Sequence, residues 1–361
     1  MTADERFMRR ALALAARGEG ETNPNPMVGC VVVQNGRIVG EGWHRRAGGP
    51  HAEIVALQRA GPRARGATLY VNLEPCSHQG QTPPCAPRVA AAGVARVVAA
   101  MRDPNPRVHG RGLARLRAAG VSVEVGLLER EARRLNLRFV AGATRPRPFV
   151  LLKAAVTLDG RIATASGESR WITSAAQRRE ARRLRRLHDG VLVGIGTVLA
   201  DDPLLLPSPR VARPFHRIVL DSRLRIPLGS RLVRTARRSP VWVVCGPPAR
   251  ARREALEARG VRVLPVPARG RVRPDLSRVL RELRQLGIWS LMVEGGSEVL
   301  GGLLRDRLFD QIALFRAPLI LGGRGGLPAF GGPDPKRLSE GVRLRPADAP
   351  SSDLFELWYP A

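Results

Sequence analysis

The sequence is poor in cysteine, in aromatic residues and in long apolar runs, and each shortage excludes a class of protein. Four cysteines in 361 residues are too few for a disulfide framework. Aromatic residues make up only 4% of the chain, too few for the stacking platforms of single-strand nucleic-acid binding. No apolar run reaches the roughly 18 residues of a membrane-spanning helix. Asp4 and Glu5 precede the first apolar stretch, so we expect a helix there and no secretion signal.

Lysine is almost absent, although the net charge is +29. Only Lys153 and Lys336 are lysines, and the other 58 basic residues are arginines. The charge excess is +11 over residues 1–146 and +18 over 147–361, nearly in proportion to length. Such an even spread favours a diffuse basic surface, which can help to attract phosphorylated substrates, over a nucleic-acid binding patch.

The order of elements predicts two α/β domains. A chain of this length is too long for one typical core, and the Pro-containing segment 142–148 suggests a boundary that gives domains 1–146 and 147–361. The first part predicts a hairpin over 27–44 with an Asn35-Gly36 turn, and then alternating strands and helices up to a helix over 129–140. The second part predicts a mostly parallel sheet covered on both faces, with strands at 149–156, 190–194, 217–221, 241–246, 261–266 and 290–296.

One constellation in the first part predicts a metal site. "HAE" places His51 and Glu53 at the start of a helix, and Cys76 and Cys85 each follow a proline. Each residue alone is more often structural. Together, two thiolates and one imidazole form a three-ligand zinc site that leaves the fourth position open for water. Glu53 can then carry protons, as in zinc deaminases, although eight residues separate the cysteines where the simple signature has two.

Motifs along the whole chain resemble one family. "TNPNPMVGCVVV", "HAE", "LEPCSHQGQTPPC", "LLKAAVTLDGRIA", "GESRWIT", "VLVGIGTVLADDPLL" and "MVEGG" occur in the order typical of the bifunctional deaminase and reductase of riboflavin biosynthesis. The resemblance implies an N-terminal cytidine-deaminase-like α/β/α domain and a C-terminal dihydrofolate-reductase-like domain with a mostly parallel sheet. It implies zinc and NADPH as cofactors.

The same resemblance implies two successive reactions. The first is hydrolytic deamination of 2,5-diamino-6-(5-phosphoribosylamino)pyrimidin-4-one. The second is reduction of the ribosyl group of 5-amino-6-(5-phosphoribosylamino)uracil to ribityl. We therefore expect a cytoplasmic homo-oligomer that acts on a small phosphorylated pyrimidine, without a nucleic-acid or membrane partner.

For the deaminase, the resemblance implies that His51, Cys76 and Cys85 hold zinc and that Glu53 transfers protons. Asn23 and His78 match substrate-facing positions, although Asn23 is also a common turn residue and a loop histidine is often simply solvated. The family usually has a basic residue in the cysteine loop, whereas this chain has Gln81. The candidates to replace it are Arg45, Arg46 and Arg88.

For the reductase, Lys153 and Asp201 are the candidate catalytic groups, and Lys153 is exceptional in a chain that otherwise uses arginine. The alternatives are a strand-end charge for Lys153 and a core position for Trp171. The resemblance implies cofactor contacts from Ala155, Trp171, Thr197, Asp201, Ser222, Gly295, Gly296 and Ser297. It implies substrate contacts from Ser169, Arg185, Leu205, Ser208, Arg210 and Glu294.

Ser208 stands where the family commonly has a phosphate-binding arginine, and Arg210 lies two residues further on. Arg210 therefore either takes over the substrate phosphate or is one of many solvated arginines. Two rival functions remain open at this point. One is a nucleic-acid base deaminase with an unrelated appended domain, and the other is a C-terminal half that binds a nucleotide without catalysis.

Overall fold

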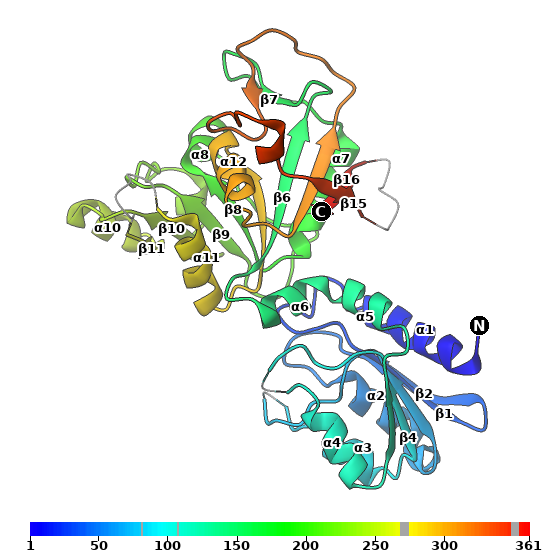
Figure 1. The fold of residues 1–361 in the computed structure, drawn as a ribbon. Coiled ribbons are helices and arrows are strands. Elements are labelled where there is room, and N and C mark those ends of the chain that lie inside the picture. The colour runs from blue at the N-terminus through cyan, green and yellow to red at the C-terminus, as the bar shows by residue number, and fades with distance from the viewer. Residues whose placement is uncertain (81, 107, 268–273, 348–353) are drawn as a thin grey trace. The chain divides into compact units, whose positions relative to one another are not determined.

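The computed structural model describes residues 1–361 except 81, 107, 268–273 and 348–353. The chain divides into two compact units, Met1–Arg145 and Pro146–Ala361, called unit 1 and unit 2 below (Figure 1). Within the described residues, no helix has both the length and the apolar character needed to cross a membrane.

Unit 1 is built on a five-stranded sheet with the order β2-β1-β3-β4-β5. Its strands are β1 (Gly29–Gln34), β2 (Arg37–Trp43), β3 (Thr68–Val71), β4 (Arg96–Ala99) and β5 (Ser122–Val125). β1 runs antiparallel to β2 and β3, whereas β3, β4 and β5 are parallel. Asn35 and Gly36 both have positive φ, 50° and 72°, as the two-residue turn predicted for Asn-Gly requires.

Helices cover both faces of this sheet. Apolar residues of α2 (Ala52–Ala60), α3 (Cys85–Ala91) and α4 (Arg111–Ala118) share one core with the sheet, and η1 (Gly61–Ala64) follows α2. Those of α1 (Ala3–Ala16), α5 (Glu129–Leu135) and α6 (Leu137–Thr144) share a second core. Because successive strand residues point to opposite faces, Val32 joins the first core and Val31 the second. Unit 1 therefore has the predicted α/β/α layers.

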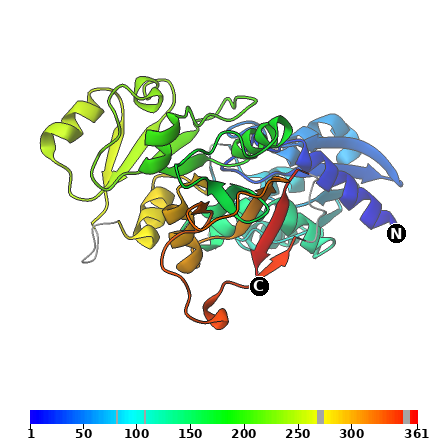
Figure 2. The ribbon, with the colours of Figure 1, turned by 90° about the horizontal axis from the view of Figure 1, so that it is seen from above.

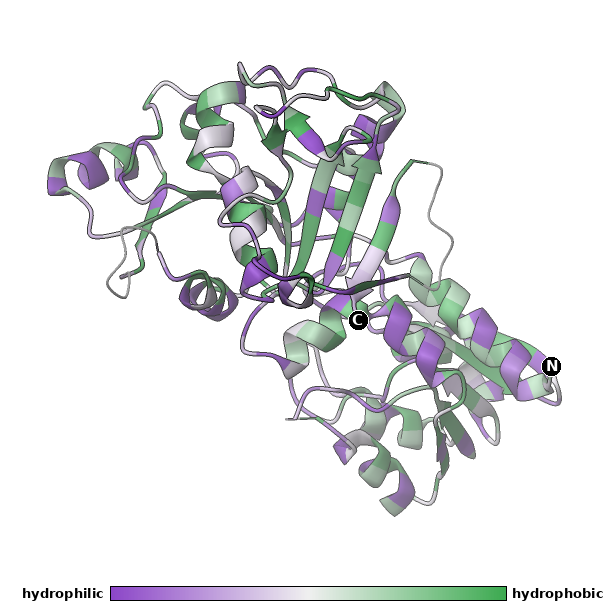
Figure 3. Cartoon of the chain, turned by 45° about the horizontal axis from the view of Figure 1, so that its top comes forward, coloured by the Kyte–Doolittle hydropathy of each residue, from purple (hydrophilic) through white to green (hydrophobic). Residues whose placement is uncertain are grey.

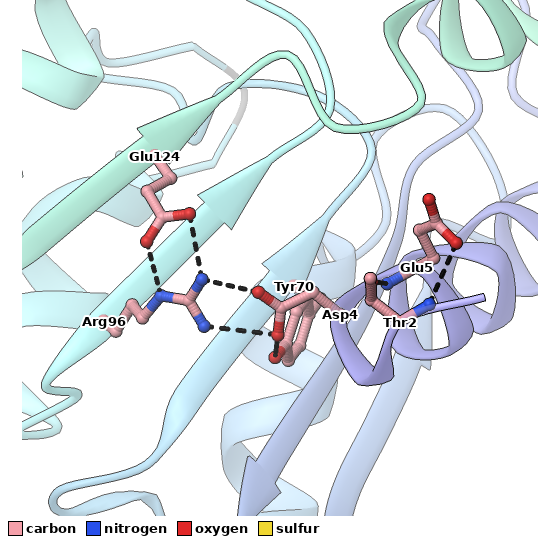
Figure 4. A network of polar contacts seen from close by, with 6 residues as sticks. All are labelled: Thr2, Asp4, Glu5, Tyr70, Arg96 and Glu124. Atoms are coloured by element: carbon pink, nitrogen blue, oxygen red, sulfur yellow. Dashed lines mark hydrogen bonds and ion pairs between the residues drawn. The ribbon is translucent and has the colours of Figure 1, made fainter.

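A polar network joins α1 to three strands of unit 1 (Figure 4). Arg96 on β4 bonds to Asp4 on α1, with Nη2 2.6 Å from Oδ2, and to Glu124 on β5, with Nε 2.8 Å from Oε1. The Tyr70 hydroxyl on β3 donates to Asp4. Burial together with this bond to the Asp4 carboxylate raises the pKa of Tyr70 to about 12. The network ties the first helix to the edge of the sheet.

The predicted single helix over 129–140 is wrong, because the structure has two helices that meet at Asn136. The backbone of Asn136 leaves the helical region, with φ −101° and ψ 25°. Its side chain accepts a hydrogen bond from Met27 N at 2.8 Å and donates one to Met27 O at 2.9 Å. A buried amide that satisfies the backbone just before β1 thus interrupts the helix at a single residue.

Unit 2 contains a nine-stranded sheet with the order β11-β10-β9-β8-β12-β6-β13-β16-β15. Its strands are β6 (Phe149–Val156), β8 (Gly190–Gly194), β9 (His216–Leu220), β10 (Val241–Cys245), β11 (Arg262–Pro265), β12 (Ser290–Gly295), β13 (Gln311–Arg316), β15 (Leu344–Pro346) and β16 (Glu356–Pro360). The strands from β11 to β13 are parallel to one another, and β16 and β15 extend the edge in antiparallel pairing. A small sheet pairs β7 (Arg161–Ala163) with β14 (Leu327–Pro328). The mostly parallel sheet was predicted, whereas its antiparallel edge was not.

Two apolar cores flank the sheet of unit 2. The first includes α11 (Leu276–Gln285) and α12 (Ser297–Arg305), and the second includes α8 (Ile195–Asp201), α9 (Arg231–Arg234) and α10 (Arg250–Glu257). The central strands are mainly hydrophobic and the helices alternate between hydrophilic and hydrophobic stretches, as expected for helices that cover a buried parallel sheet (Figure 3). The short helix η2 (Leu338–Glu340) stands away from the strands of the unit (Figure 2).

Candidate functional sites

The predicted metal ligands of unit 1 converge. His51 is the N-cap of α2, Cys85 is the first residue of α3, and Cys76 lies in the loop after β3. His51 Nδ1 is 3.2 Å from Cys85 Sγ and 3.6 Å from Cys76 Sγ, and the three donor atoms lie within 4.8 Å of one another. Three residues from separate segments therefore present their donors to a single point.

The electrostatics of this cluster suit a metal ion. The hydrogen bond from Cys85, together with those from His51 and from the Cys85 backbone, lowers the pKa of the Cys76 thiol to about 4. The same pairing raises the pKa of the Cys85 thiol. Two sulfurs and one imidazole nitrogen are the donor set of an open, catalytic zinc site. Thr82 Oγ1 lies 3.1 Å from His51 Nε2 and orients the ring from its other side.

Glu53 lies beside the cluster without belonging to it. Its side chain is buried, with the residue 3% exposed, on the first turn of α2. Burial, reinforced by the negative charge of Cys76, raises the pKa of the Glu53 carboxyl. A carboxyl that holds a proton more tightly than usual is suited to accept and return one near neutral pH. This position fits the predicted proton carrier.

Two residues near the metal cluster were missed by sequence reasoning. The ring of His44 lies edge-on to that of His51 at 5.4 Å between centroids, and His44 Nε2 is 3.3 Å from Asn25 Nδ2. Asp103 is buried, and burial raises its pKa to about 6, while His78 and Cys76 act on it electrostatically. The segment Asp103-Pro104-Asn105-Pro106 repeats the form of Asn23-Pro24-Asn25-Pro26, and this similarity could have indicated it.

The other predicted residues of unit 1 are half-buried or exposed. Asn23 is half-buried and His78 is exposed. Arg45, Arg46 and Arg88, the candidates to replace a basic loop residue, are all exposed. Gln81 lies outside the described residues.

Unit 2 has a cavity of about 2090 Å³ at the carboxyl ends of β6, β8, β9 and β12. In parallel α/β sheets this edge is where ligands bind. Of the residues predicted for the reductase, those that line the cavity are Lys153, Ala155, Ser169, Trp171, Arg185, Thr197, Asp201, Leu205, Ser208, Ser222, Glu294, Gly295, Gly296 and Ser297. Arg210 is exposed and is not among the lining residues.

A buried ion pair forms part of the cavity wall. Arg185 on α7 (Ala175–Arg186) binds Glu294 on β12 through two hydrogen bonds, one of them 2.7 Å between Nη2 and Oε2. Burial would raise the pKa of the Glu294 carboxyl, but Arg185 and, to a lesser degree, Lys153 outweigh it and the pKa is lowered. Burial lowers the pKa of Lys153. The ammonium of Lys153 is therefore a readier proton donor than an exposed lysine.

Two further predicted residues lie at the open side of the cavity. Trp171 is 68% exposed, which excludes the alternative of a core position, and Arg178 lies over its ring at 4.4 Å from the centroid. Asp201 ends α8 and bonds to Arg170, with Oδ1 3.1 Å from Nε. Both side chains therefore remain accessible to a ligand.

The glycines at the strand ends fit a dinucleotide. A Cβ on Gly295 would lie 3.0 Å from Thr197 Oγ1, and a Cβ on Gly194 would lie 3.0 Å from Val299 Cγ2. Gly296 has a φ of 81° and precedes α12, whose N-terminus faces the cavity through Ser297. Bare backbone at a helix N-terminus is the usual cradle for a pyrophosphate. The cavity exceeds the usual volume for a single ligand, up to about 1,000 Å³, and has room for a cofactor and a substrate together.

Comparison with protein families gives the same division. The family described as "Cytidine and deoxycytidylate deaminase zinc-binding region" matches residues 1–101, and the "RibD C-terminal domain" matches residues 148–351. Fold, donor set and cavity together define a two-domain enzyme, a zinc-dependent deaminase joined to an NADPH-dependent reductase.

Full-length relatives extend this class to a particular family. The chain is 46% identical to riboflavin biosynthesis protein RibD of Aquifex aeolicus over 321 residues, 88% of each chain, and 45% identical to that of Escherichia coli over 335 residues, 88% of this chain and 89% of the relative. The structure of Acinetobacter baumannii RibD matches with a TM-score of 0.90 and 37% identity, over 99% of each chain. A Thermotoga maritima diaminohydroxyphosphoribosylaminopyrimidine deaminase/5-amino-6-(5-phosphoribosylamino)uracil reductase matches with a TM-score of 0.85 and 36% identity, again over 99% of each. The chain belongs to the RibD family of riboflavin-biosynthesis enzymes.

Proposed function

We propose that residues 1–146 deaminate 2,5-diamino-6-(5-phosphoribosylamino)pyrimidin-4-one and that residues 147–361 reduce 5-amino-6-(5-phosphoribosylamino)uracil. The observation that carries the proposal is the cluster of His51, Cys76 and Cys85 beside a buried, non-ligating Glu53. The relatives named for these two activities match the chain at both ends, which supports the pairing of the reactions. In the proposal, His51, Cys76 and Cys85 hold the zinc.

The first reaction replaces an amino group on the pyrimidine ring with a carbonyl oxygen. Zinc, when bound, lowers the pKa of water so that it can attack the amidine-like ring carbon. Glu53 accepts a proton from the attacking water and delivers it to the departing nitrogen, so that the C–N bond breaks and ammonia leaves. Its raised pKa favours this double role. Thr82 keeps the imidazole of His51 in place, while Asn23 and His78 bind the substrate.

The second reaction reduces the sugar. NADPH, when bound, supplies the hydride that reaches C1′. Gly295, Gly296 and Ser297 hold its phosphates, with further contacts from Ala155, Trp171, Thr197 and Ser222. The reduction opens the sugar ring, because the C1′–O4′ bond breaks and O4′ takes up a proton. Lys153 places its ammonium near the sugar as donor of that proton and as a point charge, and Asp201 is the second polar group there. Ser169, Leu205 and Glu294 position the substrate, with Arg185 fixed against Glu294.

We further propose a cytoplasmic homo-oligomer that uses no nucleic acid and no membrane. The even distribution of arginine and the scarcity of aromatic residues support this over the deaminase of nucleic-acid bases. A reductase half that merely binds nucleotide is disfavoured, because the predicted polar groups line one cavity.

One experiment tests the proposed function. Purified protein is given the diaminopyrimidine substrate with NADPH, and ammonia release and NADPH oxidation are followed together, with an RNA oligonucleotide as the competing substrate. We expect equal amounts of ammonia and oxidised cofactor from the small substrate and no ammonia from RNA. Ammonia from RNA alone would support the rival deaminase, and ammonia without NADPH oxidation would support an inactive second half.

A further inference from the structure

We propose that Arg182, a residue that motif comparison does not single out, is the cation that binds the substrate phosphate in the cavity of unit 2. This inference rests on the proposed reductase function and names a binding residue for it. It follows from the way in which α7 meets the cavity.

Helix α7 turns one row of arginines toward the cavity. Arg178, Arg182 and Arg185 all line it. Their spacing of four and three residues places them on one face of the helix. Arg179 and Arg183 are exposed and are not among the lining residues. The helix therefore presents three guanidinium groups to a ligand and keeps Arg179 and Arg183 in solvent.

Two of the three guanidinium groups are already engaged. Arg185 is neutralised by its bidentate pairing with Glu294 and also donates to Leu206 O at 3.1 Å. Arg178 donates to Thr173 O and lies over the ring of Trp171. Neither side chain can bind a phosphate through its full set of donors without giving up these contacts.

Arg182 differs from both. It is half-buried, and among the described residues its guanidinium has no hydrogen-bond or carboxylate partner. A planar guanidinium in a cavity wall without a counter-charge is a site for an anion that accepts two hydrogen bonds, such as a phosphate. The charge that the cavity leaves uncompensated on this wall is therefore that of Arg182.

The loop after α8 brings a second polar group to the same wall. Ser208 N donates to Arg182 O at 3.3 Å, which fixes the loop against α7, and Ser208 also lines the cavity. Arg210, two residues further on, is exposed and is not a lining residue. The structure thus favours Arg182 over Arg210 as the cation that complements the short side chain at position 208.

Five other arginines line the cavity away from α7. Arg170 is paired with Asp201, and Arg231 is the first residue of α9. Arg223 and Arg225 follow Ser222 after β9, and Arg305 ends α12, so these three lie on elements proposed to hold the cofactor. A substrate-phosphate site at Arg182 therefore predicts a loss of substrate binding with no loss of cofactor binding.

The test uses full-length, zinc-loaded protein and starts from the deaminated substrate, so that unit 1 does not limit the rate. Arg182→Gln removes the charge and keeps much of the side-chain length. We expect KM for the substrate to rise about 10- to 100-fold, the scale of a lost charge-assisted hydrogen bond, with KM for NADPH changed less than about twofold. Arg182→Lys should recover part of the loss. Arg179→Gln, on the same helix but exposed, is the matched control and should leave both constants unchanged.

The dephosphorylated substrate completes a thermodynamic cycle, in which removal of the phosphate is combined with removal of the Arg182 charge. The parent should lose affinity for it, whereas Arg182→Gln should bind both forms of the substrate almost equally, as calorimetry without NADPH can show. An unchanged KM in Arg182→Gln, a selective rise in KM for NADPH, or a loss shown only by Arg210→Gln would each overturn the inference. Failure of the parent to oxidise NADPH would instead overturn the proposed function, so the two failures are distinguishable.

Discussion

The two units assemble their sites in opposite ways. In unit 1 the metal donors come from two short motifs, and Glu53, the proposed proton carrier, is two residues from His51. In unit 2 the cavity collects residues from four parallel strands and the helices that follow them, between Lys153 and Leu327. A metal site needs a few residues of particular types, whereas a cavity for two ligands is lined by many residues whose types can vary. The metal site can therefore be predicted from two short motifs, whereas the cavity can be predicted only from a pattern of motifs along the chain.

The largest expected effect is a complete loss of one activity while the other is retained. Cys76→Ala or Cys85→Ala removes one of three metal ligands, so we expect loss of bound zinc together with loss of ammonia release. Reduction of the deaminated substrate should persist, because the lining residues of its cavity all belong to unit 2. Metal analysis and the two separate assays check this. A parallel loss of reduction would mean that the sites are not independent.

A subtler change in unit 1 should separate metal binding from catalysis. Glu53→Gln keeps the size of the side chain but cannot carry a proton, so zinc content should stay normal while deamination falls at least about 10²-fold. Glu53 is buried beside the donors without being one of them. Zinc content and ammonia release, measured on the same preparation, distinguish a role in metal binding from a role in catalysis. Loss of metal would make Glu53 a ligand, and near-normal turnover would remove it from the mechanism.

In unit 2 the corresponding weak point is an ion pair. Glu294→Gln leaves Arg185 buried without its counter-charge, and we expect the free energy of unfolding of unit 2 to fall by about 3 kcal/mol. Glu180→Gln, which disturbs the more exposed pair with Arg183, is the matched control and should cost less than about 1 kcal/mol. Hydrogen exchange of amides in the β6 and β12 strands measures the change. Equal losses in the two variants would show that burial does not set the strength of these pairs.

The smallest expected effect is in unit 1 and depends on pH. Hydrogen bonds to Arg96 lower the pKa of Asp4, where Tyr70 also contributes, and the pKa of Glu124. Because both carboxyls have a lower pKa when folded, their contribution is complete above the unfolded pKa of about 4 and is lost as the pH falls through the folded values. Arg96→Met should therefore cost unit 1 about 1 kcal/mol at pH 7 and less at pH 3. Urea unfolding of parent and variant at both pH values tests this, and a cost independent of pH would assign the effect to lost packing.

Sequence reasoning identified residues whose chemistry is local and missed those that depend on distant partners. His51, Glu53, Cys76 and Cys85 could be predicted because their spacing carries the chemistry, and the geometry brings the three ligands together. The pairing of Arg185 with Glu294 could not, because it joins a helix to a strand 109 residues further on. That the guanidinium of Arg182 lacks a partner among the described residues is likewise evident only from the structure.

The fold shows the same limit. Strands with continuous apolar runs, such as β8 and β12, were predicted nearly to the residue. The edge strands β15 and β16 were missed because their residues are exposed or half-buried, which leaves no strong apolar pattern to read. The break at Asn136 was missed because its cause is a contact with Met27, far away in the chain.

That contact sets an order of events during synthesis. Both polar groups of the Met27 backbone are satisfied by side chains from later in the chain, Asn72 and Asn136, and Asn136 supplies the only acceptor seen for Met27 N in the part of the chain that the structure describes. A nascent chain emerges from its N-terminus, so Met27, two residues before β1, lacks its hydrogen bonds to Asn136 until residue 136 has left the ribosome. The hydrogen bonding of unit 1 is thus completed by a residue near its C-terminal end. A polypeptide that ends before Asn136 would leave the backbone amide of Met27, just before β1, without this partner.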